Sequence, residues 1–155
     1  MNASTDRIEK QIILKAPRSR VWQALTTAEK FGEWFGVELQ GKTFAVGKRV
    51  QGPKANCDGE KKGNYWDALI ERIDPEQFFA YRWHPYCADK TANLEDEPMT
   101  LVEFELKDTA EGTLLHVVES GFDRIDPTRR AEAFPMHTNG WEYQMKNIEA
   151  YLAKL

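Results

Sequence analysis

The C-terminal segment carries the pattern that most restricts how this chain can fold. Its large apolar residues recur at steps of three and four, which places them along one face of an α-helix. They are Trp141, Met145, Ile148, Leu152 and Leu155. A stripe of this length needs a large apolar partner, so we predict a long helix packed over a sheet. Pro135 lacks a backbone donor, and we therefore expect a short turn before it and one long helix after it.

The rest of the chain supplies the strands for such a sheet. Ile8, Ile12 and Leu14 alternate in a predicted first strand, and two short helices follow, the second ending at Gly36. Strand-like runs then alternate with turn residues such as Asp74-Pro75-Glu76. The predicted strands are Val37–Leu39, Arg49–Gly52, Tyr65–Ile73, Phe78–Trp83, Met99–Leu106 and Thr113–Ser120. This order predicts one α+β domain over residues 1–155, with an antiparallel meander and a polar loop at 86–98.

Composition excludes several classes of protein. The net charge of −4 and a pI of about 5.5 provide no basic stripe for nucleic acid, and no apolar run approaches a membrane span. Cys57 and Cys87 lack C-x-x-C spacing, and no signal sequence precedes the first strand, so we expect free thiols and a cytoplasmic protein. The histidines at 84, 116 and 137 share no metal-ligand spacing, and we expect neither a metal nor a cofactor.

Short motifs fall where the predicted elements begin and end. Those that matter most are Ala16-Pro17, Val21-Trp22-Gln23-Ala24-Leu25-Thr26, Trp34-Phe35-Gly36, Tyr81-Arg82-Trp83, Glu119-Ser120-Gly121-Phe122 and Gly140-Trp141. Together with the element order, they resemble the START-related superfamily called SRPBCC, and most closely its branch named for the activator of the heat-shock-protein-90 ATPase. The resemblance implies a helix-grip (START/Bet v-like) fold: a curved antiparallel sheet, two short helices and a long C-terminal helix. It also implies a cavity between sheet and helix for a small hydrophobic or amphipathic molecule.

Strand alternation and the family register suggest which side chains face that cavity. Glu119 would point inward beside apolar neighbours, where burial raises a carboxyl pKa unless donors compensate. Alternatively, Glu119 reaches solvent or pairs with Arg82 or Arg124. His137 precedes Trp141 by one helical turn, so both would lie near the cavity mouth. The candidate ligand-binding residues are Tyr65, Tyr81, Trp83, Phe104, Val117, Glu119, His137, Trp141 and Met145.

Three functions remain open at this point. The sequence favours a binding protein over an enzyme, because it contains no nucleophile motif or phosphate loop. A cyclase or hydratase would use Glu119 and His137 as acid and base. A stress-related or chaperone-associated interaction module is suggested by the family name alone, and chaperone stimulation is not favoured, because the eukaryotic activator has an additional N-terminal domain. Homodimerisation is left open, as is gating of the cavity by the 86–98 loop.

Overall fold

Strands and helices follow one another in the order that the sequence predicts. The computed structural model describes residues 7–53, 64–83, 88–89, 99–125 and 127–154 of the 155-residue chain. The elements are β1 (Arg7–Leu14), α1 (Arg18–Thr26), α2 (Ala28–Phe35), β2 (Arg49–Pro53), β3 (Asn64–Asp74), β4 (Phe78–Trp83), β5 (Ala88–Asp89), β6 (Thr100–Thr109), β7 (Gly112–Ser120), the 3-10 turn η1 (Phe122–Arg124) and α3 (Pro127–Ala153).

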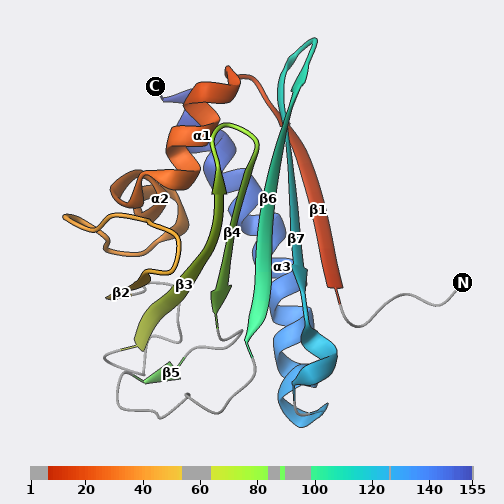
Figure 1. Cartoon of the computed structure of the whole chain (residues 1–155). Coiled ribbons are helices and arrows are strands. Elements are labelled where there is room, and N and C mark those ends of the chain that lie inside the picture. Colours follow the sequence, from red (N-terminus) through yellow and green to blue (C-terminus); the bar gives the residue numbers. More distant parts are fainter. Residues whose placement is uncertain (1–6, 54–63, 84–87, 90–98, 126, 155) are drawn as a thin grey trace, which may run out of the picture.

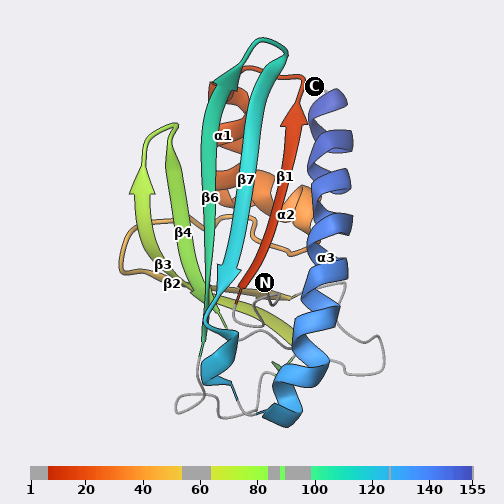
Figure 2. The same ribbon diagram turned by 90° about the vertical axis from the view of Figure 1, so that its right-hand side faces the viewer.

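The strands build one curved antiparallel sheet. Its order is β1-β7-β6-β4-β3-β2, with β5 paired to β3 off this path. The long helix α3 lies behind the sheet and runs along the strands (Figure 1), and the side view shows it on one side of β1 and β7 (Figure 2). The α+β helix-grip fold expected from the resemblance is confirmed.

Side chains on the inner face of the sheet line up in rows across the strands. Tyr81 of β4 is paired with Val102 of β6, which in turn is paired with Glu119 of β7. All three are fully buried, at 0% exposure. The strand alternation predicted from the sequence is therefore confirmed, because neighbouring positions such as Glu103 and His116 are only partly buried.

The helix α3 covers this face with the predicted stripe. Trp141, Met145, Ile148 and Leu152 are all buried, whereas Leu155 lies outside the described residues. The predicted break at Pro135 is wrong, because this residue lies inside the 27-residue helix. A proline removes one intrahelical hydrogen bond, and the packing of the helix over the sheet outweighs that local loss.

Pro135 and Gly140 lie inside α3, where both residue types are unfavourable, and they allow a stability test. Pro135 is exposed, and a side chain added at Gly140 would meet no atom within 4 Å. We expect Pro135→Ala to raise the free energy of unfolding by about 1–3 kcal/mol and Gly140→Ala by about 1 kcal/mol. Urea unfolding measures both, and an unchanged midpoint for Pro135→Ala would show that the proline is not in a strained helical position.

Two further segments differ from the prediction or extend it. Val37–Leu39 forms no strand, although Val37 makes one isolated bridge, because the chain turns at Gly36 in the left-handed region with φ 96°. Val37 and Leu39 are both buried, and this burial explains their strand-like pattern. Within the predicted loop at 86–98, residues 88–89 form β5, and the gating role of the loop concerns residues outside the described part.

Candidate functional site

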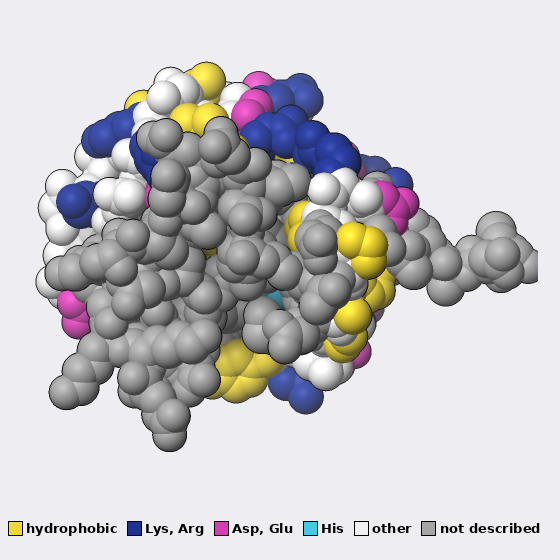
Figure 3. All heavy atoms as spheres, turned by 90° about the horizontal axis from the view of Figure 1, so that it is seen from below, with side chains coloured by type: hydrophobic (Ala, Val, Ile, Leu, Met, Phe, Trp, Pro, Cys, Tyr) yellow, Lys and Arg dark blue, Asp and Glu magenta, His cyan; other side chains and the backbone are white. Residues whose placement is uncertain are grey.

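Side chains from four elements meet at one end of the sheet, where β4 and β7 end and β6 begins. They come from Trp83, Thr100, Glu119 and two positions one turn apart on α3, His137 and Trp141. Figure 1 shows this as the lower end of the sheet, beside the first half of α3, and Figure 3 views the molecule from this side. The sheet register and the helical turn bring together residues far apart in the sequence.

Glu119 is the centre of this cluster and accepts four hydrogen bonds. Its Oε2 atom accepts from Trp83 Nε1 at 2.8 Å and from Thr100 Oγ1 at 2.5 Å. Its Oε1 atom accepts from Trp141 Nε1 at 2.8 Å and lies 2.6 Å from His137 Nδ1. Each carboxylate oxygen therefore has two partners, which is the arrangement that an ionised, buried carboxylate requires.

The alternative placement of Glu119 is wrong. Its side chain does not reach solvent, since its exposure is 0%. Arg82 instead donates to Glu71 at 2.7 Å, and Arg124 donates to the carbonyl oxygen of Met99 at 3.1 Å. Both arginines thus have partners of their own, and Glu119 is left to the indole, hydroxyl and imidazole donors of the interior.

The ionisation of Glu119 is decided by two opposing effects. Burial raises its pKa, whereas the charge of His137 and the hydrogen bonds from His137, Thr100 and Trp141 lower it, and the net effect is a pKa below the usual 4.5. These donors supply the compensation that the sequence alone left open. Glu119 is consequently an anion at neutral pH.

This lowered pKa gives a pH dependence with a definite sign. A carboxyl whose folded-state pKa is depressed stabilises the protein above its unfolded pKa, and that contribution is lost as the pH falls through the lowered folded value. We expect the free energy of unfolding of the native protein to fall in acid below about pH 4.5. Glu119→Gln should remove this part of the acid dependence. The free energies of unfolding of the two proteins, measured by urea unfolding, should therefore converge as the pH is lowered from neutral to about 3. Parallel pH profiles would contradict this prediction.

His137 is oriented by Glu119. An ionised carboxylate can only accept, so the hydrogen on His137 must be on Nδ1 when the ring is neutral, and Nε2 then carries a lone pair. Within the described part of the chain, Nε2 has no hydrogen-bond partner, and the side chain is 11% exposed. The ring also packs edge-on against Trp83 and Phe122, with centroids 5.4 and 5.9 Å apart. One ring nitrogen is therefore fixed, and the other is available to a ligand.

The remaining predicted site residues lie in the aromatic interior around this cluster. Tyr81, Phe104, Val117 and Met145 are all buried. Trp141 packs against Phe104 at 5.8 Å and against Trp83 at 6.1 Å. Tyr65 belongs to β3, but its side chain lies outside the described part of the structure, and its role stays a prediction.

Sequence reasoning missed one residue of the interior, Thr100, and did not choose between pocket lining and core for a second one, Trp66. Thr100 continues the alternation of Val102 and Phe104 by one step toward the strand start, and extending that pattern would have found it. Trp66 is 1% exposed and lies on the same face of β3 as Ala68 and Ile70. Its alternation with those two buried residues is the signal that would have placed it inward.

Metal-binding and membrane-spanning features have no support in the described residues. They contain no group of three or more side chains suited to hold a metal ion. None of the helices that the structure describes is long and apolar enough to cross a membrane. His116 contacts Glu9 at 3.0 Å on the outer face of the sheet, away from His137. Cys57, Cys87 and His84 lie outside the described part.

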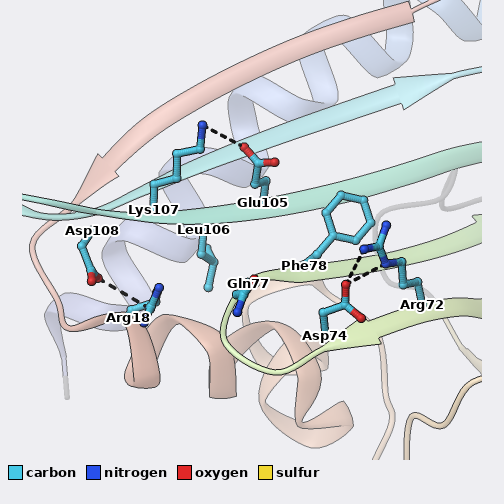
Figure 4. A pocket seen from close by; sticks show the side chains of 9 residues that line it. All are labelled: Arg18, Arg72, Asp74, Gln77, Phe78, Glu105, Leu106, Lys107 and Asp108. Atoms are coloured by element: carbon cyan, nitrogen blue, oxygen red, sulfur yellow. Dashed lines mark hydrogen bonds and ion pairs between the residues drawn. The ribbon is translucent and has the colours of Figure 1, made fainter.

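A surface pocket of about 420 Å³ lies at the opposite end of the sheet, beside the turn between β3 and β4. Figure 4 shows that its charged side chains point toward one another. Arg72 pairs with Asp74, Lys107 lies 3.4 Å from Glu105, and Arg18 lies 3.6 Å from Asp108. Because these charges offset one another, this pocket is a weaker candidate than the Glu119 cluster.

Comparison with known proteins agrees with this architecture. No curated protein matches the sequence significantly. A solved structure from Arthrobacter aurescens aligns with a TM-score of 0.78 at 12% identity, over 99% of this chain and 91% of that one. A protein from Mesorhizobium loti aligns with a TM-score of 0.72 at 21% identity, over 96% and 97% of the two chains.

A third solved structure is longer than this chain. DynU16, from the dynemicin biosynthetic locus, aligns with a TM-score of 0.70 at 22% identity over 96% of this chain, which spans 47% of that protein. At these identities the three structures show a shared fold. The model of the family described as "Activator of Hsp90 ATPase homolog 1-like protein" matches residues 15–153, and the chain therefore belongs to this family, within the SRPBCC superfamily.

Proposed function

We propose that this protein binds a small amphipathic molecule between its sheet and α3, with a polar group of that molecule held by His137. Domains of this family are typically ligand-binding. The observation that carries the proposal is the open Nε2 atom of His137, whose ring is fixed by a fully buried, ionised Glu119. A fixed imidazole beside aromatic rings offers one polar contact in an apolar setting, as ligand sites in proteins commonly do.

The cost of burying Glu119 supports a role beyond stability. An ionised carboxylate in an apolar interior loses its hydration, and the hydrogen bonds that replace it seldom make the arrangement more stable than apolar packing. Trp83, Thr100 and Trp141 supply three donors to the carboxylate. His137 differs from these three, because its second nitrogen has no partner among the described residues. Binding a ligand accounts for that second nitrogen, which a purely structural tie does not need.

Two histidine variants test the proposal. His137→Gln keeps a donor for Glu119 and removes the second ring nitrogen. His116→Gln is the matched control, because His116 is paired with Glu9 on the outer face. Thermal-shift and native mass-spectrometry screens should first find a stabilising molecule among fatty acids, aromatic ketones and hydroxylated polycycles. We expect His137→Gln to weaken its binding about 10-fold, which corresponds to about 1.4 kcal/mol, and His116→Gln to leave it unchanged.

Two results would count against ligand binding at His137. One is the absence of any stabilising molecule in the screen. The other is equal affinity in the native protein, His137→Gln and His116→Gln. Gene neighbourhood offers a way to choose the molecules of the screen.

Acid–base catalysis is a second candidate, favoured by the 2.6 Å contact between Glu119 Oε1 and His137 Nδ1. A carboxylate on one imidazole nitrogen with the other left open is how enzymes orient a histidine as a general base. If the bound molecule is a substrate of a cyclase or hydratase, His137→Gln should lower kcat by about 100-fold or more. Recovery of the molecule unchanged after prolonged incubation with the native protein would exclude this candidate.

An interaction module has less support. The described residues expose three large apolar side chains, Ile13, Val46 and Tyr143, which belong to three different segments. A chaperone-associated role would require a continuous apolar patch. A cytoplasmic location and a homodimer stay predictions, and size-exclusion chromatography with light scattering would measure the oligomeric state.

A further inference from the structure

Two hydrogen-bond donors in the interior have no partner within the described part of the chain. They are the indole Nε1 of Trp66 and the hydroxyl of Tyr81. Both residues are almost completely buried, at 1% and 0% exposure. Their rings lie side by side, with centroids 5.4 Å apart and planes at 68°. Two unpaired donors thus come from neighbouring rings on adjacent strands, β3 and β4.

Within the described part of the chain neither donor has an acceptor, and the rings that pack beside them include two phenylalanines. The ring centroid of Phe31 in α2 lies 5.4 Å from that of Trp66 and 6.2 Å from that of Tyr81. The centroid of Phe44 lies 6.1 Å from that of Trp66. Buried donors in folded proteins nearly always have a partner, either in the protein, in ordered water or in a ligand. An apolar wall with two neighbouring donors suits a single oxygen acceptor that enters with an apolar body.

The charge of Glu119 restricts which acceptor fits. Tyr81, Val102 and Glu119 form one row across three strands, so the Cα atoms of Tyr81 and Glu119 are about two strand spacings apart, on the order of 10 Å. Burial, and to a smaller extent the charge of Glu119, raise the pKa of Tyr81 well above 10, so its hydroxyl stays a neutral donor. The same carboxylate would repel an anionic ligand at this depth.

We propose that Trp66 and Tyr81 bind the carbonyl or ether oxygen of an uncharged, largely apolar molecule, and that the site discriminates against carboxylates such as fatty acids. This inference rests on the proposed function, since it names the chemical class of the ligand. It assigns Trp66 a role in ligand binding. The ligand would have two polar contacts, an inner one at Trp66 and Tyr81 and an outer one at His137.

Three probes of nearly equal size test the proposal by equilibrium dialysis at pH 7. They are 2-acetylnaphthalene, which carries a ketone, 2-ethylnaphthalene, which carries no acceptor, and 2-naphthoate, which carries a negative charge. We expect the ketone to bind about 10-fold more tightly than the hydrocarbon, because two donors gain a partner. The carboxylate should bind more weakly than either.

Matched variants identify the donors. Tyr81→Phe removes one hydroxyl and should abolish most of the preference for the ketone, while the affinity for the hydrocarbon stays the same. Trp66→Phe should reduce the preference as well. Tyr143→Phe is the control, because Tyr143 is 57% exposed on α3, and its preference should equal that of the native protein. Without ligand, Tyr81→Phe should unfold at the same temperature as the native protein or higher, because it removes an unpaired buried hydroxyl.

Several outcomes would overturn the inference. Equal affinity for the ketone and the hydrocarbon would show that the two donors do not bind the ligand oxygen. The proposal that the protein binds a small molecule would remain. A ketone preference that survives in Tyr81→Phe, tight binding of 2-naphthoate, or a lower melting temperature for Tyr81→Phe would also contradict it. If none of the three probes binds although the screen finds a stabilising molecule, the inference fails and the proposed function stands. If the screen finds no molecule either, both fail.

Discussion

Replacing Glu119 with alanine is expected to lower the free energy of unfolding by about 3–5 kcal/mol, a large share of the stability of a typical domain. The substitution leaves the indole N–H groups of Trp83 and Trp141 and the hydroxyl of Thr100 without their acceptor. It also removes the charge that faces His137. Urea unfolding at pH 7, followed by tryptophan fluorescence, would measure the loss.

Glu105→Ala is the control for this experiment. Glu105 also lies on the sheet, but its partner Lys107 is exposed, and a surface pair of this kind contributes little. We expect a change within about 0.5 kcal/mol. A loss of less than about 1 kcal/mol in Glu119→Ala would show that the buried carboxylate is not the acceptor that holds the cluster together.

Replacing Trp141 with alanine is expected to cost about 3–5 kcal/mol as well, for a different reason. The indole packs against Phe35 at 6.0 Å and Phe104 at 5.8 Å, so its removal leaves a cavity between α3 and the sheet. It also removes the donor to Glu119 Oε1. Equilibrium unfolding in urea would again give the magnitude.

Two companion variants separate packing from hydrogen bonding at this position. Trp141→Phe retains most of the ring and loses the N–H group, and we expect it to cost about 1–2 kcal/mol. Tyr143→Ala, on the exposed side of the same helix, should change stability by no more than about 0.5 kcal/mol. Equal losses in Trp141→Ala and Tyr143→Ala would contradict the packing of Trp141 in the core.

Period-two alternation carried most of the site prediction. Once β7 is placed with Leu115 and Val117 inward, Glu119 must follow them onto the same face. The spacing of His137 and Trp141 by one turn similarly requires that both approach one region of the sheet. These local rules, together with the strand register that the family resemblance implied for β7, placed an acid and an imidazole at the same end of the fold.

The partners of Glu119 could not be derived in the same way. Arg82 and Arg124 were reasonable partners for a carboxylate, but the choice between them and the indole donors depends on how α3 lies across the sheet. The continuity of α3 through Pro135 could not be derived from the sequence for the same reason, because it depends on tertiary packing that outweighs a local preference. Long-range geometry also determines that Trp66 and Tyr81 have no acceptor among the residues that the structure describes.

The pairing of β1 with β7 sets the order in which this chain can fold as it is synthesised. Glu9 on β1 contacts His116 on β7, which is 107 residues later in the sequence. During translation, β1 therefore has no partner in the sheet until nearly all the strands have been made, and the helix that covers them emerges last. Until then the alternating apolar residues of β1, including Ile8 and Leu14, are exposed. A chain that is stalled on the ribosome before residue 112 lacks β7 and cannot complete its sheet. Substitutions in β1 should therefore change aggregation during synthesis more than their effect on the stability of the native protein suggests.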